Sequence, residues 1–388
     1  MNTMSNESVR PRIVSNGMRV LQIGTDRTIF DAKSASAARM REYGKRFEGL
    51  DIIVFSLRPA RRSLGEGGRH GVRDTNLGEY VRVLATNSLS RFLYPMDALW
   101  LALKLPKPEV VSVQDPFETG IAGWLIALLR GAALHVQVHT DFLSPEFSRL
   151  SHLNRLRVRI AGFVLRRASR VRVVSERIRR SIGAKYKLRA PISVLPIFVD
   201  VEKYRRAQIG TKLAAREHLF PTKLLVVSRL EPEKNVGLAI HAFAKAALEK
   251  SCLIIIGEGS EKKALQKMAG DRGVGKWVFF EGRTDPAQYY KLASLLLAPS
   301  LYEGYGMVIV EALASGTPVI STDVGAARES GAIIAEEDDF AKAIASWYER
   351  GPREGKLLNY PYKSFEEYVE AYCKDIESSS TKAGRDRQ

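Results

Sequence analysis

Charged side chains gather where predicted strands end in the second half of the chain, and the first such group suits a diphosphate. Residues 228–235 (SRLEPEKN) follow an apolar run at 223–227. Arg229 offers a planar fork of hydrogen-bond donors, and Lys234 adds a mobile point charge five residues later. Because both cations bind phosphate oxygens, the pair could hold a diphosphate. The alternative is a solvated charged loop at the start of a helix.

The segment 300–319 (SLYEGYGMVIVEALASGTPV) predicts a second part of the same site. A strand ends there, a loop bracketed by glycines carries Glu303, and a helix begins near Gly306. Free amides at the start of that helix, together with its dipole, would attract an anion. The backbone of this anion site would come from Gly304, Tyr305, Gly306 and Met307.

Glu311 lies in the second turn of the same predicted helix, on the face that carries Met307. A carboxylate in that position can accept hydrogen bonds from two vicinal ribose hydroxyls, as acidic residues do in dinucleotide sites. We therefore expect Glu311 to bind the ribose of a nucleotide. The alternative makes Glu303 a solvent-facing loop acid and Glu311 a surface acid of the helix.

Two single residues at strand ends carry weaker signals. Gly257 begins the segment GEGSE after an apolar run, and a glycine there lets the backbone approach a ligand closely. Any tight turn between a strand and a helix uses a glycine in the same way. His139 ends the apolar run 133–139, where a histidine either packs in the interior or faces a ligand.

The elements that would position these residues alternate between strands and helices in both halves of the chain. Continuous apolar strands in such an alternation indicate parallel sheets covered by helices. The fold class is therefore α/β, with two Rossmann-like doubly wound domains facing across a cleft. In the first half we expect strands at 19–24, 51–56, 81–85, 110–114, 133–139 and 171–175, and helices at 97–105, 120–130 and 151–167.

The length of 388 residues also suits two domains, which we expect to be hinged near residue 200. Residues 57–79 are rich in glycine and arginine and predict a flexible surface loop. The expected divisions are a disordered tail (1–17), an acceptor-side domain (18–200), a donor domain (201–355) and a C-terminal segment (356–388) with a helix at 360–376 and disorder from 377.

Taken together, SRLEPEKN, GEGSE and LYEGYGMVIVEALASGTPVIST resemble the donor-binding half of the GT-B glycosyltransferases of the retaining family 4 (group 1) type. The hallmark of that family is two glutamates separated by seven residues, matched here by Glu303 and Glu311. The dense resemblance covers residues 222–330. It implies transfer of a sugar from a nucleoside-diphosphate sugar to an acceptor hydroxyl with retention, in cell-surface glycan or glycolipid synthesis.

The resemblance also implies roles for individual residues. Glu303 would hold hydroxyls of the donor sugar, and His139 would contact that sugar from the first domain. Arg229 and Lys234 would stabilise the leaving diphosphate, which would take the acceptor's proton. Backbone at Gly257, Gly282 and Arg283 would contact the base.

The sequence departs from the family pattern in two places. Residues 25–31 (TDRTIFD) stand where the family has a Gly-Gly loop, which leaves open how the first domain contacts donor and acceptor. Ala326 stands where a second glycine is common.

We expect no bound metal or other cofactor. The leaving diphosphate could be stabilised by the cations and amides alone, and no Asp-x-Asp motif stands at a strand end to bridge a metal. The two cysteines lie far apart in the sequence, which suits a reducing cytosol. Neither a membrane span nor an export signal is visible, so we expect a cytoplasmic protein that meets a membrane only peripherally.

Positive charge is concentrated in the first half of the chain. Residues 1–200 hold 33 lysines and arginines against 17 acids, whereas residues 201–388 hold 27 against 26. Eleven arginines fall within 149–180. The helical part of this stretch interleaves arginines with apolar residues, so it either covers a sheet or lies on an anionic membrane. We expect covering to be its main role. The candidate partners are a nucleotide-sugar donor, a sugar or lipid-diphosphate-linked acceptor and an anionic membrane surface.

Three other functions fit parts of the sequence. A nucleotide-sugar epimerase could use the same two-domain architecture, and product analysis would distinguish it from a transferase. A non-catalytic sugar-nucleotide binding protein is open because the glycine loop is missing. Nucleic-acid binding is the weakest alternative, because the charge is accompanied by no nucleic-acid motif or aromatic stacking platform.

Overall fold

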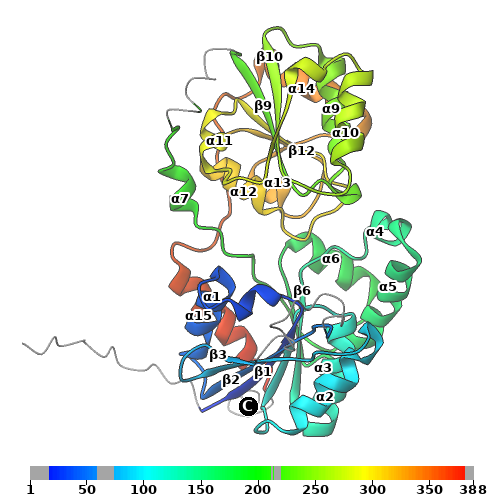
Figure 1. The fold of residues 1–388 in the computed structure, drawn as a ribbon, viewed down its shortest axis with the longest axis vertical. Coiled ribbons are helices and arrows are strands. Elements are labelled where there is room, and N and C mark those ends of the chain that lie inside the picture. The colour runs from blue at the N-terminus through cyan, green and yellow to red at the C-terminus, as the bar shows by residue number, and fades with distance from the viewer. Residues whose placement is uncertain (1–16, 59–73, 211–212, 214–219, 381–388) are drawn as a thin grey trace, which may run out of the picture.

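The computed structural model describes residues 17–58, 74–210, 213 and 220–380. They form two parallel sheets with helices on both faces, one in each half of the chain (Figure 1). The N-terminal domain is the lower body in Figure 1, and the C-terminal domain is the upper one. The predicted fold class is thereby confirmed.

The N-terminal sheet has eight strands in the order β3-β4-β2-β1-β5-β6-β7-β8. All are parallel except β3, which pairs antiparallel with β4 at one edge. The apolar runs of the sequence form the central strands, which are almost wholly buried. The strands are β1 (Arg19–Gly24), β2 (Gly49–Val54), β3 (Thr75–Asn76), β4 (Val81–Ala85), β5 (Val110–Val113), β6 (Ala133–Val138), β7 (Arg170–Val173) and β8 (Ile192–Val194).

Helices cover the N-terminal sheet, and serine side chains cap several of them. Ser34, Ser151 and Ser175 each accept a hydrogen bond from a first-turn amide, which fixes where α1, α5 and α6 begin. The helices are η1 (Arg27–Phe30), α1 (Ala35–Gly44), η3 (Arg91–Leu93), α2 (Tyr94–Leu103), α3 (Glu118–Arg130), α4 (Pro145–Leu150), α5 (His152–Leu165) and α6 (Glu176–Lys185).

The loop predicted at 57–79 differs from the structure at its second end. Residues 59–73 lie outside the described residues, but Thr75–Asn76 forms β3 and Leu77 is buried. The amide of Leu77 donates to the carbonyl of Val81, so the segment turns back along β4. Burial of one leucine and pairing to an edge strand outweigh the glycine-rich composition there.

The C-terminal sheet has six strands in the order β11-β10-β9-β12-β13-β14, all of them parallel. Its strands are β9 (Thr222–Val227), β10 (Ser251–Ile256), β11 (Val278–Gly282), β12 (Leu295–Ala298), β13 (Val319–Ser321) and β14 (Ile333–Ile334). Its helices are η4 (Pro232–Lys234), α9 (Val236–Ala246), α10 (Lys262–Asp271), η5 (Gly275–Trp277), α11 (Ala287–Leu292), α12 (Met307–Ala314), α13 (Ala327–Ser330), η6 (Glu337–Asp339) and α14 (Phe340–Arg350).

The chain crosses between the domains twice. It leaves the N-terminal sheet after β8 and passes through α7 (Val201–Arg205), and the last helix, α15 (Phe365–Glu377), returns to the N-terminal domain beside α1 (Figure 1). The ring of Tyr372 stacks on that of Tyr43 with 4.3 Å between centroids. Ser379 beyond the helix is buried, so order extends past the predicted start of disorder at 377. The predicted terminal tails otherwise lie outside the described residues.

Candidate functional site

A cavity of about 290 Å³ lies where the two domains meet, and we call it the cleft pocket. Most of its lining comes from the carboxyl ends of β9 and β12 and from the start of α12. His139, which follows β6 of the other domain, completes it. The lining residues used below are His139, Ser228, Arg229, Lys234, Ser300, Glu303, Gly304, Tyr305, Gly306 and Met307.

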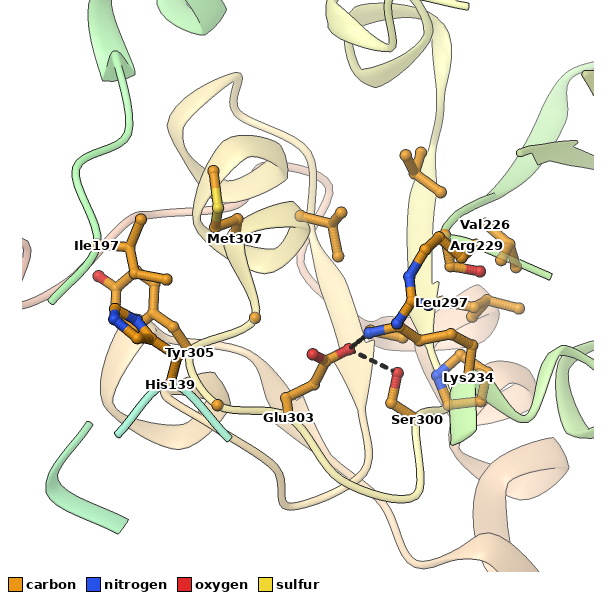
Figure 2. A pocket seen from close by; sticks show the side chains of 17 residues that line it. His139, Ile197, Val226, Arg229, Lys234, Leu297, Ser300, Glu303, Tyr305 and Met307 are labelled. Carbon is orange, nitrogen blue, oxygen red and sulfur yellow. Dashed lines mark hydrogen bonds and ion pairs between the residues drawn. The ribbon is translucent and has the colours of Figure 1, made fainter. Parts of the chain in front are cut away.

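Glu303 lies at the centre of this lining, between Lys234 and Arg229 on one side and His139 and Tyr305 on the other (Figure 2). Its Oε1 accepts hydrogen bonds from Lys234 Nζ at 2.5 Å and from Ser300 Oγ at 2.9 Å. Both side chains of the ion pair are about 15% exposed, at 15% and 16%. The pair therefore faces the cavity but is largely shielded from bulk water. Shielding from water strengthens the attraction between the two charges.

Arg229 is more open. Its side chain is 69% exposed, and Nη2 donates to Glu233 Oε1 at 2.7 Å. The carbonyl of Glu233 accepts from the amide of Leu301, which ties the loop after β9 to the loop after β12. This contact brings the two predicted halves of the diphosphate site into one place.

The start of α12 supplies backbone donors to the same cavity. Gly306 occupies the N-cap position with φ at +85°, a conformation that favours glycine. A glycine N-cap offers no side-chain oxygen to the first-turn amides. The amide of Ile309 donates to the carbonyl of Gly306, so the amides of Met307 and Val308 are the donors that a ligand could use. The carbonyl of Tyr305 accepts from the amide of Ala326, the residue that departs from the family pattern. Ala326 is compatible with this loop because only its backbone is used.

His139 faces the pocket from the N-terminal domain as a neutral imidazole. Burial and, second, the positive charge of Arg172 lower the pKa of His139 to about 3, although part of its surface is open to the pocket. The domains touch at this point. Ser175 Oγ donates to the carbonyl oxygen of Gly304 at 2.9 Å, and a Cβ on Gly304 would lie 1.8 Å from the carbonyl oxygen of His139.

Glu311 takes a different position from the other predicted residues. It is buried, does not belong to the pocket lining, and its Oε2 accepts from the hydroxyl of Tyr290 at 2.7 Å. Burial raises the pKa of Glu311, against the lowering effect of hydrogen bonds from Tyr290 and Tyr204. Its place one turn into α12 follows the expected spacing from Glu303, and its role toward a ribose stays a prediction.

The three residues predicted to contact the base also lie outside the pocket lining. Gly257 has φ at +145°, and a Cβ there would lie 1.8 Å from the carbonyl oxygen of Ser228. Its amide donates to the carbonyl of Gly282. These two glycines therefore bring backbone segments together behind the loop that carries Arg229. Whether they and Arg283 contact a base stays a prediction.

Two serines of the pocket were not singled out from the sequence. Ser228 Oγ is buried and, within the described part of the chain, has no hydrogen-bond partner, so a ligand group could satisfy it. Ser300 Oγ holds Glu303 in place. Ser228 directly follows β9, and Ser300 is the second residue after β12. This position at a strand end was the signal by which the sequence could have identified them. The hydrogen bond between Ser175 and Gly304 depends on how the two domains pack, so no local pattern predicts it.

The remaining titratable groups give no separate metal centre. Among residues 17–58, 74–210, 213 and 220–380, no group of three or more His, Cys, Asp or Glu side chains could hold a metal ion. In the same described ranges, no helix is both long enough and apolar enough to span a membrane.

Comparison with protein families covers both domains. The sequence model described as "Glycosyl transferases group 1" matches residues 215–364, the part that holds the ion pair and α12. The model described as "Glycosyltransferase Family 4" matches residues 37–203. The chain belongs to the GT-B glycosyltransferases. The family resemblance noted in the sequence is thus confirmed.

Curated relatives match parts of this GT-B chain. An alpha-monoglucosyldiacylglycerol synthase of Streptococcus pneumoniae is 27% identical over 260 residues, which cover 61% of this chain and 58% of the relative. A D-inositol 3-phosphate glycosyltransferase of Catenulispora acidiphila is 32% identical over 173 residues, which cover 38% of this chain and 40% of the relative. The matches therefore span less than two thirds of these relatives.

Solved structures match the fold over nearly the whole chain. Anabaena Alr3699/HepE in complex with UDP superposes with a TM-score of 0.65 at 18% identity, covering 95% of this chain and 99% of that one. Sucrose-phosphate synthase from Thermosynechococcus elongatus gives a TM-score of 0.66 at 16% identity, covering 95% and 98%. At these identities the superpositions show a shared fold.

Proposed function

We propose that this GT-B chain transfers a sugar from a nucleoside-diphosphate sugar to an acceptor hydroxyl, with retention of the anomeric configuration. The observation that carries the proposal is the cleft pocket, where Lys234, Arg229, Glu303 and the first amides of α12 face His139 of the other domain. Its cations and amides suit a diphosphate, and Glu303 suits sugar hydroxyls. The structural neighbour crystallised with UDP supports the choice of donor class.

The chemistry follows from where charge develops. Negative charge grows on the diphosphate as the bond to the sugar breaks, and Lys234, Arg229 and the α12 amides stabilise it in place. Glu303 aligns the sugar through its hydroxyls. The leaving phosphate takes the proton of the acceptor hydroxyl on the same face of the sugar, which preserves the configuration. We propose that no metal or other cofactor takes part, because these donors already supply positive potential at the diphosphate.

Ligand-induced thermal stabilisation tests the donor class. UDP, GDP and ADP would each be added to three full-length proteins: the wild type, Lys234→Ala and the matched control Lys262→Ala. Lys262 pairs with Glu258 at 2.6 Å on an exposed helix of the same domain, away from the pocket lining. One nucleotide should stabilise the wild type and the control, by about 2.7 kcal/mol at a hundred times its Kd, and leave Lys234→Ala unchanged. Equal stabilisation of all three chains would overturn the site.

Product analysis tests the reaction itself. Incubation with a labelled donor and NMR of the product distinguish transfer with retention from inversion at the anomeric carbon. Conversion of the donor into an epimer would establish the epimerase alternative, and binding without turnover would establish the non-catalytic one. Glu303→Ala should abolish transfer, and a cooperative thermal transition checks that the variant still folds. Wild-type turnover in this variant would contradict the role of Glu303.

We further propose a lipid-diphosphate-linked acceptor at an anionic membrane, on its cytoplasmic side. The arginine-rich helix α5 leaves Leu153 and Leu156 about half exposed, so it offers apolar as well as basic side chains to a membrane. A longer apolar ridge follows η3 and α2. Its exposed side chains are Leu89, Phe92, Leu93, Met96, Trp100 and Leu103.

This ridge suits a lipid surface because apolar and basic side chains are combined on it. Phe92 is 93% exposed, and Lys104 Nζ lies 2.9 Å from the ring centroid of Trp100. The ridge begins after β4, at the carboxyl edge of the sheet that also carries His139. An aromatic ring and a lysine at one site are typical of proteins that lie at the membrane interface.

Vesicle sedimentation tests the membrane proposal. Vesicles with phosphatidylserine should bind the chain, and phosphatidylcholine vesicles should bind it much less, with the difference reduced by salt. The double variant Phe92→Ser/Trp100→Ser should lose binding. Trp277→Ser, which removes a 44% exposed tryptophan from the C-terminal domain, is the control. Equal binding to both vesicles would overturn the proposal, and a dimer that dissociates in the double variant would assign the ridge to a second copy.

A further inference from the structure

A chain of buried hydrogen bonds runs from the C-terminal helix to the cleft pocket. Asp375 of α15 contacts His135 Nε2 at 3.0 Å, and His135 Nδ1 contacts Ser112 Oγ at 2.8 Å. Gln137 Nε2 lies 3.0 Å from Ser112 Oγ, and its Oε1 lies 3.1 Å from His139 Nε2. The first four of these residues are at most 4% exposed, so water does not compete for their bonds.

The direction of every bond in this chain follows from its carboxylate end. Burial by itself raises the pKa of Asp375, but its hydrogen bond with His135 and other contacts lower it to about 2, so the carboxylate only accepts. His135 must then donate through Nε2 and accept through Nδ1. The hydroxyl of Ser112 donates its one proton to Nδ1 of His135, and its oxygen therefore accepts a hydrogen bond from Gln137 Nε2. The carbonyl oxygen of Gln137 is left facing His139.

Arg172 fixes the same orientation independently. This arginine is 1% exposed in β7, and its Nη1 donates to Gln137 Oε1 at 2.8 Å. A guanidinium has donors only, so the atom it meets must be the amide oxygen. Tyr372 of α15 also lies 2.9 Å from Gln137 Nε2, and Tyr368 lies 3.3 Å from Arg172 Nη2. Arg172 is one of the eleven arginines of the basic stretch 149–180, and it is buried in this network.

We propose that Gln137 is a positioning residue, which Asp375 and Arg172 orient so that it keeps the proton of His139 on Nε2. An oxygen that already meets Arg172 can only accept from His139, so the ring nitrogen that faces it must carry the proton. The other nitrogen, Nδ1, then has a lone pair and only accepts. In the proposed transferase, on which this consequence rests, His139 would accept a bond from a sugar hydroxyl and would not bind the diphosphate.

Nitrogen NMR of the full chain tests the tautomer without any activity measurement. In protein labelled with ¹⁵N-histidine, assigned by its loss in His139→Asn, the His139 signals should show a protonated Nε2 and an unprotonated Nδ1. Gln137→Met should give a mixture of tautomers. Gln137→Glu keeps oxygens that face Arg172 and His139, so it should restore the wild-type pattern. A proton on Nδ1 in the wild type would overturn the proposal, and this result needs no folded variant.

Kinetics test the consequence. Gln137→Met should lower kcat/KM by about tenfold to a hundredfold, as misplacement of a substrate contact does. When Gln137→Met is combined with His139→Ala, kcat/KM should fall no further than in His139→Ala alone, because both changes remove the same function. Losses that multiply would mean that Gln137 acts apart from His139. The expected tautomer in a chain that transfers no sugar would contradict the proposed function and leave the positioning role standing.

Discussion

Gly304 and His139 lie so close that only glycine fits between the two domains. A Cβ on Gly304 would lie 1.8 Å from the carbonyl oxygen of His139, far inside van der Waals contact. Gly304 belongs to the loop that carries Glu303, and His139 directly follows β6 of the other domain. The separation of the domains at the pocket is therefore set by the absence of one side chain.

Replacing this glycine should open the pocket. Gly304→Ala should lower kcat/KM by about a hundredfold, because the added methyl group forces the Glu303 loop away from His139. Steady-state kinetics measure this effect, and thermal unfolding checks that each domain still folds. Gly183→Ala is the matched control, since a Cβ there meets nothing within 4 Å. Wild-type activity in Gly304→Ala would show that this approach of the domains is not needed.

The ion pair between Lys234 and Glu303 should couple in folding as well as in activity. Lys234→Met and Glu303→Gln each leave a partner that is about 15% exposed without its counter-charge. A double-mutant cycle in urea should give a coupling free energy of about 1–3 kcal/mol. Each single variant should also lose transfer. Additive effects on unfolding would mean that the pair forms only when ligand is bound.

The folded chain should lose stability from about pH 6.5 downward. The pKa of His139 is lowered from 6.5 to about 3 in the folded chain. Between these pH values the unfolded chain binds a proton at His139 and the folded chain does not. The free energy of unfolding should therefore fall by about 1.4 kcal/mol per pH unit for this histidine, between roughly pH 6.5 and 3. His135, whose pKa burial also lowers, adds to the same trend.

Urea titrations at several pH values measure that slope. His139→Asn should reduce it by about 1.4 kcal/mol per pH unit below pH 6.5. His152→Asn removes an exposed histidine at the start of α5 and serves as the control for losing a histidine. An unchanged slope in His139→Asn would show that the imidazole is accessible to protons in the folded chain.

The hydroxyl of Tyr290 should stabilise the fold through Glu311. Tyr290→Phe leaves a buried carboxylate short of a donor and should lower the free energy of unfolding by about 1–3 kcal/mol. Tyr289→Phe removes the neighbouring hydroxyl, which lies 3.2 Å from the carboxylate of Glu281 and is less buried, so its cost should be smaller. Chemical denaturation compares the two. Equal costs would mean that Glu311 does not depend on this bond.

Much of the fold and half of the site could be predicted from local patterns. The apolar runs at β1 and β10 predict buried parallel strands because only such strands lack a polar face. The place of Lys234 and Glu303 follows, because parallel strands present their carboxyl ends at one edge of the sheet. The same local signals missed β3, whose pairing depends on a neighbour rather than on its own composition.

Sequence alone determined the family, the two α/β domains and the cations and carboxylate of the cleft pocket. Each of these depends on the residue types and spacings within a short segment of the chain. Only the tertiary structure decided which distant groups meet. It placed α15 against strands β5 and β6, which lie more than two hundred residues earlier, buried Arg172 beside Gln137, and turned Glu311 toward Tyr290. Hydrogen bonds between such distant residues depend on how whole elements pack, and no local pattern records that packing.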